Sequence, residues 1–513
     1  MKTNDFSRRQ DVWIGIGLFV FTLLSRVPFR SQILYHWDAV NFAYGMREFR
    51  VAKEQPQPPG YILYVWLCRL VDLLFGDAQT TMVWISIVAS ALAAVALFYL
   101  GRSMFGRRAG LVAALLLATS PLFWFYGEIA LPHTLDTLLV IVSVWWLYET
   151  MQGDHRYLYP AIAIMAIAGG VRQQTLVFLA PLLLFALRRV GWKRFLTAGM
   201  LGAVICLAWF VPLMTLSDGF ANYMSVMGAY NRRFQDTTSI FMGAGWGGIK
   251  YNVRKLAMYT LYGWNVALVP GIVYAARRFW YREWLQRWEK PVFLTLWVAP
   301  ALFFYTSIHM GQQGLIFVFL PALLLISVVA LIRLLTTRPR WLMAATAALV
   351  ALNAGIFCLV PEYPLGPGTQ RLLTRATLVN SDRYYQDRFR AIEENFAPES
   401  TAILADNWHH VEYYLPKYVR LPFRVVGKRN QDWGNPVGNP QDYAAVSPSD
   451  LKLQPDSEGR VAVVIFDPVL VNFNDSSEVT TELDLENGST LAYFVLEKGQ
   501  KLRYGPSTFG VIR

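Results

Sequence analysis

An acidic side chain follows the first apolar run of the chain, where few charged residues are expected. Asp38 lies within the stretch His36-Trp37-Asp38-Ala39-Val40-Asn41-Phe42, and the motif Gln57-Pro58-Pro59-Gly60-Tyr61 follows it. A carboxylate that meets a hydroxyl group can remove its proton as a general base. The same acid could instead cap the helix that it opens, by accepting a hydrogen bond from the first backbone N–H groups. The sequence leaves both roles open.

Two further acids stand near the ends of later apolar runs. Glu128 follows the aromatic stretch 121–126, where it is either a second catalytic acid or a boundary residue of an aromatic belt at the membrane surface. Asp136 lies about one to two turns inside the next run. An unpaired carboxylate is costly inside a bilayer, so Asp136 needs a partner. We expect it to bind substrate or to form a hydrogen bond with a neighbouring helix.

Histidines accompany these acids. Of the six in the chain, His36, His133 and His309 lie in predicted outer segments, and the first two are within five residues of Asp38 and Glu128, respectively. They could line one polar cavity that binds substrate, or they could hold a divalent cation, although their spacing matches no metal motif. We therefore expect no resident cofactor, with a divalent cation as the alternative.

Three arginines in the outer segments suit an anionic substrate group. Arg172 follows Gly169-Gly170 in a short break between two apolar runs, and Arg232 and Arg233 precede a glycine-rich stretch at 243–248. A guanidinium group can donate two parallel hydrogen bonds to a phosphate. We expect these arginines to bind substrate. The glycines predict either a mobile loop that closes over the substrate or a plain flexible connector.

The composition indicates which elements must hold these residues in place. Of 513 residues, 55% are hydrophobic and only 16% are charged, which is too apolar for an ordinary soluble protein. Runs long enough to cross a bilayer predict a polytopic α-helical membrane protein with about eleven transmembrane helices. They lie near residues 12–28, 79–100, 109–125, 131–150, 157–171, 174–188, 195–214, 254–276, 291–307, 314–333 and 341–360.

Positive charge in the connections predicts the orientation. Lysine and arginine concentrate in alternate connections, all on the side shared with the N-terminus. The positive-inside rule then places the N-terminus in the cytoplasm and residues 362–513 outside. We therefore predict an integral, multi-pass protein of the plasma or inner membrane, with its first apolar run retained as an uncleaved span.

Two domains are expected. Residues 1–361 are strongly basic and form the transmembrane domain, including an outer loop, 29–78, with two surface helices. Residues 362–513 are slightly acidic, and their patterns predict a small extracytoplasmic α/β domain. Its expected strands are 401–405, 461–466 and 491–496. Because the basic residues lie between apolar runs rather than on one patch, we expect no nucleic-acid partner.

The motifs, in this order, resemble the C-type (GT-C) glycosyltransferases, in particular the branch of protein O-mannosyltransferases and aminoarabinose transferases. The matching residues are Asp38, 57–61 and 120–128 and, with less similarity, 169–174 and 311–314. The resemblance is good over residues 10–215 and decreases beyond them. The C-terminal part matches no catalytic module.

The resemblance implies an inverting transferase that moves a sugar from a polyprenyl-phosphate donor to a hydroxyl acceptor at the outer membrane face. Asp38 would be the general base and Glu128 would orient the acceptor or the base. Arg172, or the Arg232–Arg233 loop, would stabilise the charge of the departing phosphate. Membrane lipid, the lipid-linked donor and a lipid, glycan or protein acceptor are the implied partners. Because Ala39 stands where protein O-mannosyltransferases have a second acid, the acceptor stays open.

Two other functions are alternatives: a transporter or flippase of lipid-linked sugars, and a non-catalytic membrane scaffold. The sequence shows no inverted repeat, and Asp136 is its one deep acid, which favours the enzyme over the transporter. The enzyme interpretation requires that Asp38 project into a solvated, outward-opening chamber together with Glu128 and Arg172.

Overall fold

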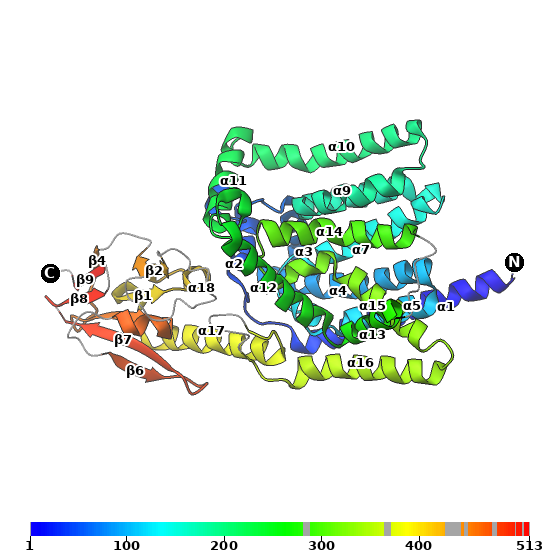
Figure 1. Cartoon of the computed structure of the whole chain (residues 1–513). Coiled ribbons are helices and arrows are strands. Elements are labelled where there is room, and N and C mark those ends of the chain that lie inside the picture. Colours follow the sequence, from blue (N-terminus) through cyan, green and yellow to red (C-terminus); the bar gives the residue numbers. More distant parts are fainter. Residues whose placement is uncertain are drawn as a thin grey trace. The chain divides into compact units, whose positions relative to one another are not determined.

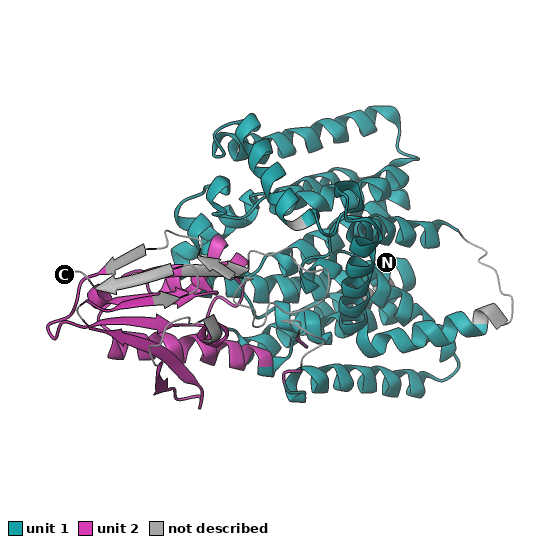
Figure 2. Cartoon of the chain, turned by 60° about the vertical axis from the view of Figure 1, so that its left-hand side comes forward, with its two compact units in different colours: residues 1–31, 42–361, 373–376 teal, residues 32–41, 362–372, 377–513 magenta. Residues whose placement is uncertain are grey.

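The computed structural model describes residues 2–280, 288–363, 371–425, 443–445, 450–473, 480–497, 499–504 and 507–511. The chain divides into two compact units (Figure 2). Unit 1 comprises residues 1–31, 42–361 and 373–376, and unit 2 comprises residues 32–41, 362–372 and 377–513. The segment that carries Asp38 therefore groups with the C-terminal part of the chain.

Unit 1 is helical, and each of its predicted apolar runs coincides with one or two helices. Helices suit such runs because they satisfy all backbone hydrogen bonds within the segment. In Figure 1 the longest of them run side by side. The helices that coincide with the predicted apolar runs are α1 (Lys2–Arg26), α4 (Ala78–Phe105), α5 (Arg107–Thr119), α6 (Pro121–Tyr126), α7 (His133–Met151), α8 (Leu158–Val171), α9 (Gln173–Leu187), α10 (Trp192–Thr215), α12 (Gly245–Trp264), α13 (Leu268–Trp280), α14 (Glu289–Ser307), α15 (Leu320–Leu334) and α16 (Pro339–Leu359).

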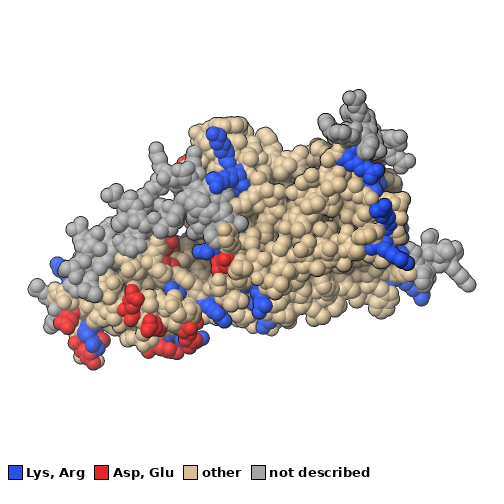
Figure 3. All heavy atoms as spheres, turned by 60° about the horizontal axis from the view of Figure 1, so that its bottom comes forward, with Lys and Arg blue, Asp and Glu red and all other residues tan. Residues whose placement is uncertain are grey.

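Several of these helices are suited to a bilayer. Among the described residues, five helical segments are long and apolar enough to cross one, and α9 and α15 are apolar but shorter. The five are Arg9–Phe29, Ala78–Phe105, Trp192–Thr215, Gly245–Arg277 and Pro339–Leu359. Figure 3 shows a broad surface of uncharged side chains over the helices of unit 1. Large apolar side chains of these helices, such as Trp13, Met200 and Met343, are exposed, as a lipid-facing surface requires.

Two shorter helices follow α1, as predicted for residues 29–78. They are α2 (Trp37–Arg47) and α3 (Ile62–Phe75). From α3, the Arg69 guanidinium donates to the carbonyl oxygens of Gly45 (2.9 Å) and Met46 (2.9 Å) at the end of α2. These bonds satisfy carbonyl groups that have no partner within the helix.

The sequence predicts a mobile loop or a flexible connector near residues 243–248, whereas most of residues 215–253 are helical in the structure. Helix α11 (Phe220–Gln235) ends before a single 3-10 turn, and α12 begins at Gly245. The buried side chain of Asn252 donates to the carbonyl oxygens of Thr238 (2.9 Å) and Thr306 (3.2 Å). This amide fixes the start of α12 against the preceding turn and α14, which the glycine content alone did not reveal.

Unit 2 contains a six-stranded mixed sheet in the order β3-β2-β1-β5-β7-β6. Strand β1 pairs in parallel with β2 and with β5, whereas β5 and β7 are antiparallel. Strands β1, β5 and β7 coincide with the three predicted strands. The strands are β1 (Thr401–Ala405), β2 (Val419–Val425), β3 (Tyr443–Ala445), β5 (Val461–Ile465), β6 (Thr481–Asp484) and β7 (Thr490–Leu496).

Two helices cover one face of this sheet, and a smaller sheet completes the unit. Helix α17 (Arg375–Asn395) contributes Tyr385, Phe389 and Ile392 to a buried cluster with β1 and β5, and α18 (Trp408–Tyr414) contributes Val411. Strands β4 (Asp450–Leu453), β8 (Lys501–Tyr504) and β9 (Ser507–Val511) form a three-stranded sheet in the order β4-β9-β8. The buried apolar face of the larger sheet thus has the helical cover that it needs.

Candidate active site

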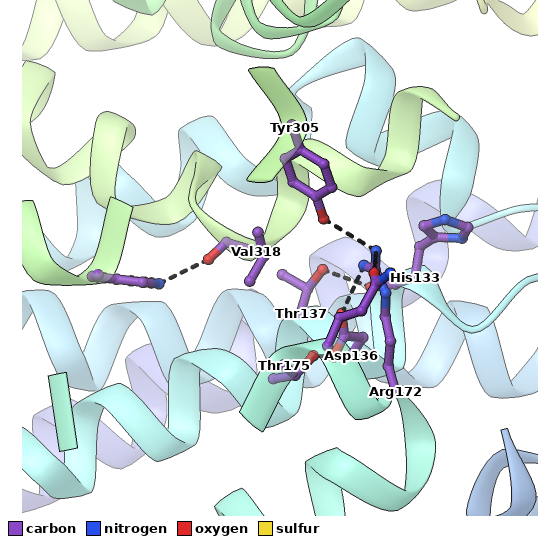
Figure 4. Close-up of polar contacts among 9 residues, drawn as sticks. His133, Asp136, Thr137, Arg172, Thr175, Tyr305 and Val318 are labelled. Atoms are coloured by element: carbon purple, nitrogen blue, oxygen red, sulfur yellow. Dashed lines mark hydrogen bonds and ion pairs between the residues drawn. The ribbon is translucent and has the colours of Figure 1, made fainter. Parts of the chain in front are cut away.

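A buried ion pair lies at the start of α7. Asp136 is in the first turn of α7, so it is nearer the helix end than the predicted one to two turns. Its Oδ2 lies 3.2 Å from Nη1 of Arg172, and its Oδ1 accepts a hydrogen bond from the Thr175 hydroxyl at 2.7 Å (Figure 4). The two charged side chains are only 4% and 6% exposed. Each needs the other, because an isolated buried charge is strongly unfavourable.

Arg172 occupies the break between α8 and α9, where the sequence predicted one. Its backbone is extended (φ −150°, ψ 106°), so α8 ends before it and α9 begins after it. Its Nη2 donates to Gln174 Oε1 (2.9 Å) and to the Tyr305 hydroxyl (3.1 Å). A fixed guanidinium group at the N-terminal end of a helix is suited to an anion.

Two motifs that are distant in the sequence meet beside this break. Gln173 Nε2 donates to the Tyr223 hydroxyl (3.1 Å), which donates in turn to the carbonyl oxygen of Pro59 (3.1 Å). A Cβ atom on Gly170 would lie 2.4 Å from Leu63 Cδ1. Glycine is therefore required for the close approach of α8 to α3. The structure thus brings the motif at 57–61 together with the motif at 169–174.

A third motif lies against the start of α7. A Cβ atom on Gly314 would lie 2.6 Å from both His133 Cδ2 and Tyr126 Cε1. The rings of His133 and Tyr126 meet edge to face, with centroids 4.9 Å apart. His133 is the first residue of α7, and its carbonyl oxygen accepts a hydrogen bond from Thr137 at 2.7 Å. The motif at 311–314 therefore positions His133 close to the turn that carries Asp136.

Glu128 is fully buried in an aromatic environment. Its Oε1 accepts a hydrogen bond from Trp124 Nε1 at 2.7 Å, and the guanidinium group of Arg26 lies over the same tryptophan ring at 4.8 Å. Its carbonyl oxygen accepts a hydrogen bond from the backbone N–H of Ser31 at 3.0 Å. These contacts fix Glu128 beside Trp124 and Ser31, and its Oε2 has no hydrogen-bond partner among the residues that the structure describes.

Arg232 and Arg233 lie in the last turn of α11 rather than in a loop. Arg233 forms a two-fold ion pair with Glu54, with Nη1–Oε1 at 2.7 Å and Nη2–Oε2 at 2.9 Å. Arg232 is exposed. The carboxylate of Glu54 offsets the charge of Arg233, which leaves Arg232 as the stronger candidate of the two for an anionic group.

His36 takes the capping position of α2 that the sequence had left open for Asp38. Its Nδ1 accepts a hydrogen bond from the backbone N–H of Asp38 at 3.0 Å, and Asp38 is the second residue of the helix. Burial, and then the nearby His410 and His409, lower the pKa of His36 to about 3. The imidazole is therefore neutral, as an acceptor must be. The side chain of Asp38 is 13% exposed, and its Oδ2 lies 3.6 Å from His36 Nδ1.

The sequence interpretation missed Tyr305 and Thr175. Thr175 follows Arg172-Gln173-Gln174 directly, and its hydroxyl at the start of an apolar run was the available signal. Tyr305 is one of several aromatic residues near the end of its run, and nothing local distinguishes it. Within the described parts of the chain, no group of three or more His, Cys, Asp or Glu side chains is placed to hold a metal ion.

Comparisons with known proteins agree with this architecture. The family model described as dolichyl-phosphate-mannose-protein mannosyltransferase matches residues 56–215. The undecaprenyl phosphate-alpha-4-amino-4-deoxy-L-arabinose arabinosyl transferase of Yersinia pestis (strain Pestoides F) is 24% identical over 315 residues, 57% of this chain and 54% of that protein. The enzyme of that name from Yersinia pseudotuberculosis serotype O:1b (strain IP 31758) matches to the same extent. The match thus spans about half the length of these relatives.

Solved structures extend the likeness over most of the chain. The crystal structure of ArnT from Cupriavidus metallidurans bound to undecaprenyl phosphate has a TM-score of 0.52 and 14% identity, covering 94% of this chain and 97% of that one. The apo structure of the same protein has a TM-score of 0.51 and 14% identity, covering 96% and 98%. The chain therefore has the fold of these proteins and is a polytopic α-helical membrane protein. The resemblance to the C-type glycosyltransferases is confirmed.

Proposed function

We propose that this chain is a glycosyltransferase that moves a sugar from a polyprenyl-phosphate donor to a hydroxyl group at the outer face of the membrane. The acceptor hydroxyl belongs to a lipid, a glycan or a protein. In this proposal about eleven helices cross the bilayer, the N-terminus is cytoplasmic, and residues 362–513 are extracytoplasmic. The alternation of basic connections along the chain supports that orientation.

The observation that carries the proposal is the guanidinium group of Arg172 at the α8–α9 break, in a chain with the fold of an undecaprenyl-phosphate-bound protein. Asp136, Tyr305 and Gln174 hold that group in one orientation. A preoriented cation stabilises negative charge that develops as a phosphate departs, with little reorganisation. We assign to Arg172 the stabilisation of the leaving polyprenyl phosphate. Asp136 positions Arg172.

Asp38 is the proposed general base. It removes the proton of the acceptor hydroxyl as the new bond to the anomeric carbon forms, and the bond from that carbon to the phosphate oxygen breaks with inversion. Because His36 already occupies the capping position, the partly exposed carboxylate of Asp38 is not needed to start α2. We further propose that His36, His133 and Arg232 bind substrate, with Arg233 in a secondary role. Glu128 acts through Trp124 as a positioning residue.

Replacement of Asp38 by asparagine tests the proposal. The variant Asp38→Asn should lower sugar transfer by about 10²–10⁴-fold, the usual contribution of a general base. Binding of undecaprenyl phosphate should be unchanged. The control is Asp77→Asn, in the same outer loop, whose carboxylate caps α4 by accepting a hydrogen bond from the Thr80 N–H at 2.8 Å. It should lower thermal stability without lowering transfer below wild type at temperatures where it is folded.

Membranes from a strain that lacks the chain, with each variant restored, provide both donor and native acceptor. The measured quantities are labelled glycan product and labelled lipid donor on each side of the membrane. Wild-type turnover by Asp38→Asn would contradict the assignment of the base. Donor translocation without a new glycosidic product would instead identify a flippase.

A further inference from the structure

The segment that carries Asp38 is fixed by side chains of unit 2. The carboxylate of Asp382, on α17, accepts hydrogen bonds from two successive backbone N–H groups, of Gln32 (2.8 Å to Oδ2) and Ile33 (3.1 Å to Oδ1). Bonds from a backbone N–H to an ionised carboxylate are among the stronger hydrogen bonds in proteins. Asp382 therefore fixes both the position and the direction of the chain where this segment begins.

Two side chains of α18 form hydrogen bonds with the backbone N–H and C=O groups of Leu34. The hydroxyl of Tyr414 accepts a hydrogen bond from the backbone N–H of Leu34 at 3.0 Å, and His410 Nε2 donates to the carbonyl oxygen of Leu34 at 2.6 Å. Burial lowers the pKa of His410 to about 4, so its imidazole is neutral and carries its proton on Nε2. Leu34 is fully buried, and Ile33 belongs to the buried cluster that contains Tyr385.

The same contacts continue up to the helix that carries Asp38. The ring of Trp37, the first residue of α2, meets the ring of His409 edge to face, with centroids 5.4 Å apart. Nδ1 of His36 then accepts a hydrogen bond from the backbone N–H of Asp38. Residues 32, 33, 34 and 37 thus each contact α17 or α18, and Asp38 follows the last of them directly. A segment needing only burial would not require polar partners at three successive residues.

We propose that Asp382, His410 and Tyr414 are positioning residues for Asp38, so that unit 2 is a required part of the transfer machinery rather than an appended domain. The inference depends on the proposed role of Asp38 as the base. A displacement of about 1 Å of a reacting group can lower a rate by about 10²-fold. Loosening residues 32–34 should therefore lower turnover without weakening the donor site.

The variant Asp382→Asn tests this inference. The amide keeps one acceptor oxygen but presents an N–H₂ group to a backbone donor. One of the two hydrogen bonds from the N–H groups of Gln32 and Ile33 is therefore lost. We expect kcat to fall by about 100-fold, with unchanged KM for the lipid donor and unchanged binding of undecaprenyl phosphate. Amide hydrogen exchange at residues 32–34 should become faster. The matched control is Glu394→Gln, an exposed carboxylate on the same helix, which should leave all four quantities at wild-type values.

A double variant separates positioning from simple loss of stability. If Asp382 acts through Asp38, then Asp38→Asn/Asp382→Asn should lose no more transfer than Asp38→Asn alone. A further loss in the double variant would overturn the inference. If Asp382→Asn fails to fold, Tyr414→Phe removes one hydroxyl from the same segment and should show the same pattern.

The outcomes also separate this inference from the proposed function. Wild-type kcat in Asp382→Asn, together with faster exchange at residues 32–34, would show that the position of this segment does not limit transfer. In that case only the positioning inference fails, provided that Asp38→Asn is still impaired. Wild-type turnover by Asp38→Asn would instead remove the base assignment on which both proposals depend.

Discussion

The buried pair of Asp136 and Arg172 allows stability and transfer to be separated. In Asp136→Asn the guanidinium group keeps only the neutral acceptors on Tyr305 and Gln174. Its side chain is 6% exposed, so water can compensate little. Removing one partner of a buried ion pair typically costs about 3–5 kcal/mol. The weakened bond from Thr175 adds about 1 kcal/mol, and we therefore expect a loss of about 4–6 kcal/mol in the free energy of unfolding.

Removing both charges should restore much of that stability but not the activity. Arg172→Gln leaves a buried carboxylate and should be destabilised to a similar extent. In Asp136→Asn/Arg172→Gln neither charge remains, so the loss should be smaller than the sum of the two single losses by a few kcal/mol. Transfer should stay as low as in Arg172→Gln, because the departing phosphate no longer meets a cation.

The assay combines tryptophan fluorescence during unfolding of the full chain in detergent with sugar transfer in membranes. The matched control is Glu289→Gln, because Glu289 pairs with Arg188 (2.7 Å) and Arg189 (2.9 Å) in bridges whose side chains are 23% to 68% exposed. Such a pair is worth about 0–1 kcal/mol. Recovery of transfer in the double variant would show that Arg172 has only a structural role. Equal stability losses in Asp136→Asn and Glu289→Gln would refute the magnitude derived from burial.

Two further predictions concern packing and pH. Gly170→Ala places a Cβ atom 2.4 Å from Leu63 Cδ1 and should destabilise the protein by about 1–3 kcal/mol. The control Gly199→Ala, whose added Cβ atom would have nothing within 4 Å, should be neutral or stabilising. The midpoints of unfolding compare the two variants, and equal midpoints would contradict the close approach of α8 to α3. Burial, and then the charge of Asp467, raise the pKa of Asp406 from 3.8 to about 7. The stability that the protonated carboxyl contributes is therefore present below about pH 4 and is lost as the pH rises through about 7. Asp406→Asn should unfold at a higher temperature than wild type at pH 8 but not at pH 4, and parallel pH profiles would disprove the shift.

Much of the fold could be predicted because its signals are local. A run of apolar residues determines its own helix, since the backbone bonds of a helix form within the segment. The break at Arg172 was visible for the same reason, as were strands β1, β5 and β7 of unit 2. The glycine-rich stretch after α11 was misinterpreted because the side chain that orders it, Asn252, contacts residues far along the chain.

In the candidate site, too, the residue types could be predicted from the sequence, whereas their pairing could not. The sequence singled out Asp38, Asp136 and Arg172 as candidates, because a charged side chain beside an apolar run is conspicuous and costly. It could not pair Asp136 with Arg172, because their positions, 36 residues apart, meet only when α7, α8 and α9 pack.

Tertiary structure decided which groups hold these residues in place. Tyr305 reaches Arg172 across 133 residues of sequence, and Asp382 reaches Gln32 across 350. The type of a residue and its neighbours along the chain determine its charge and its helix. Its partner is chosen by packing, because the energy of a buried polar group depends on which donors and acceptors the whole fold places beside it.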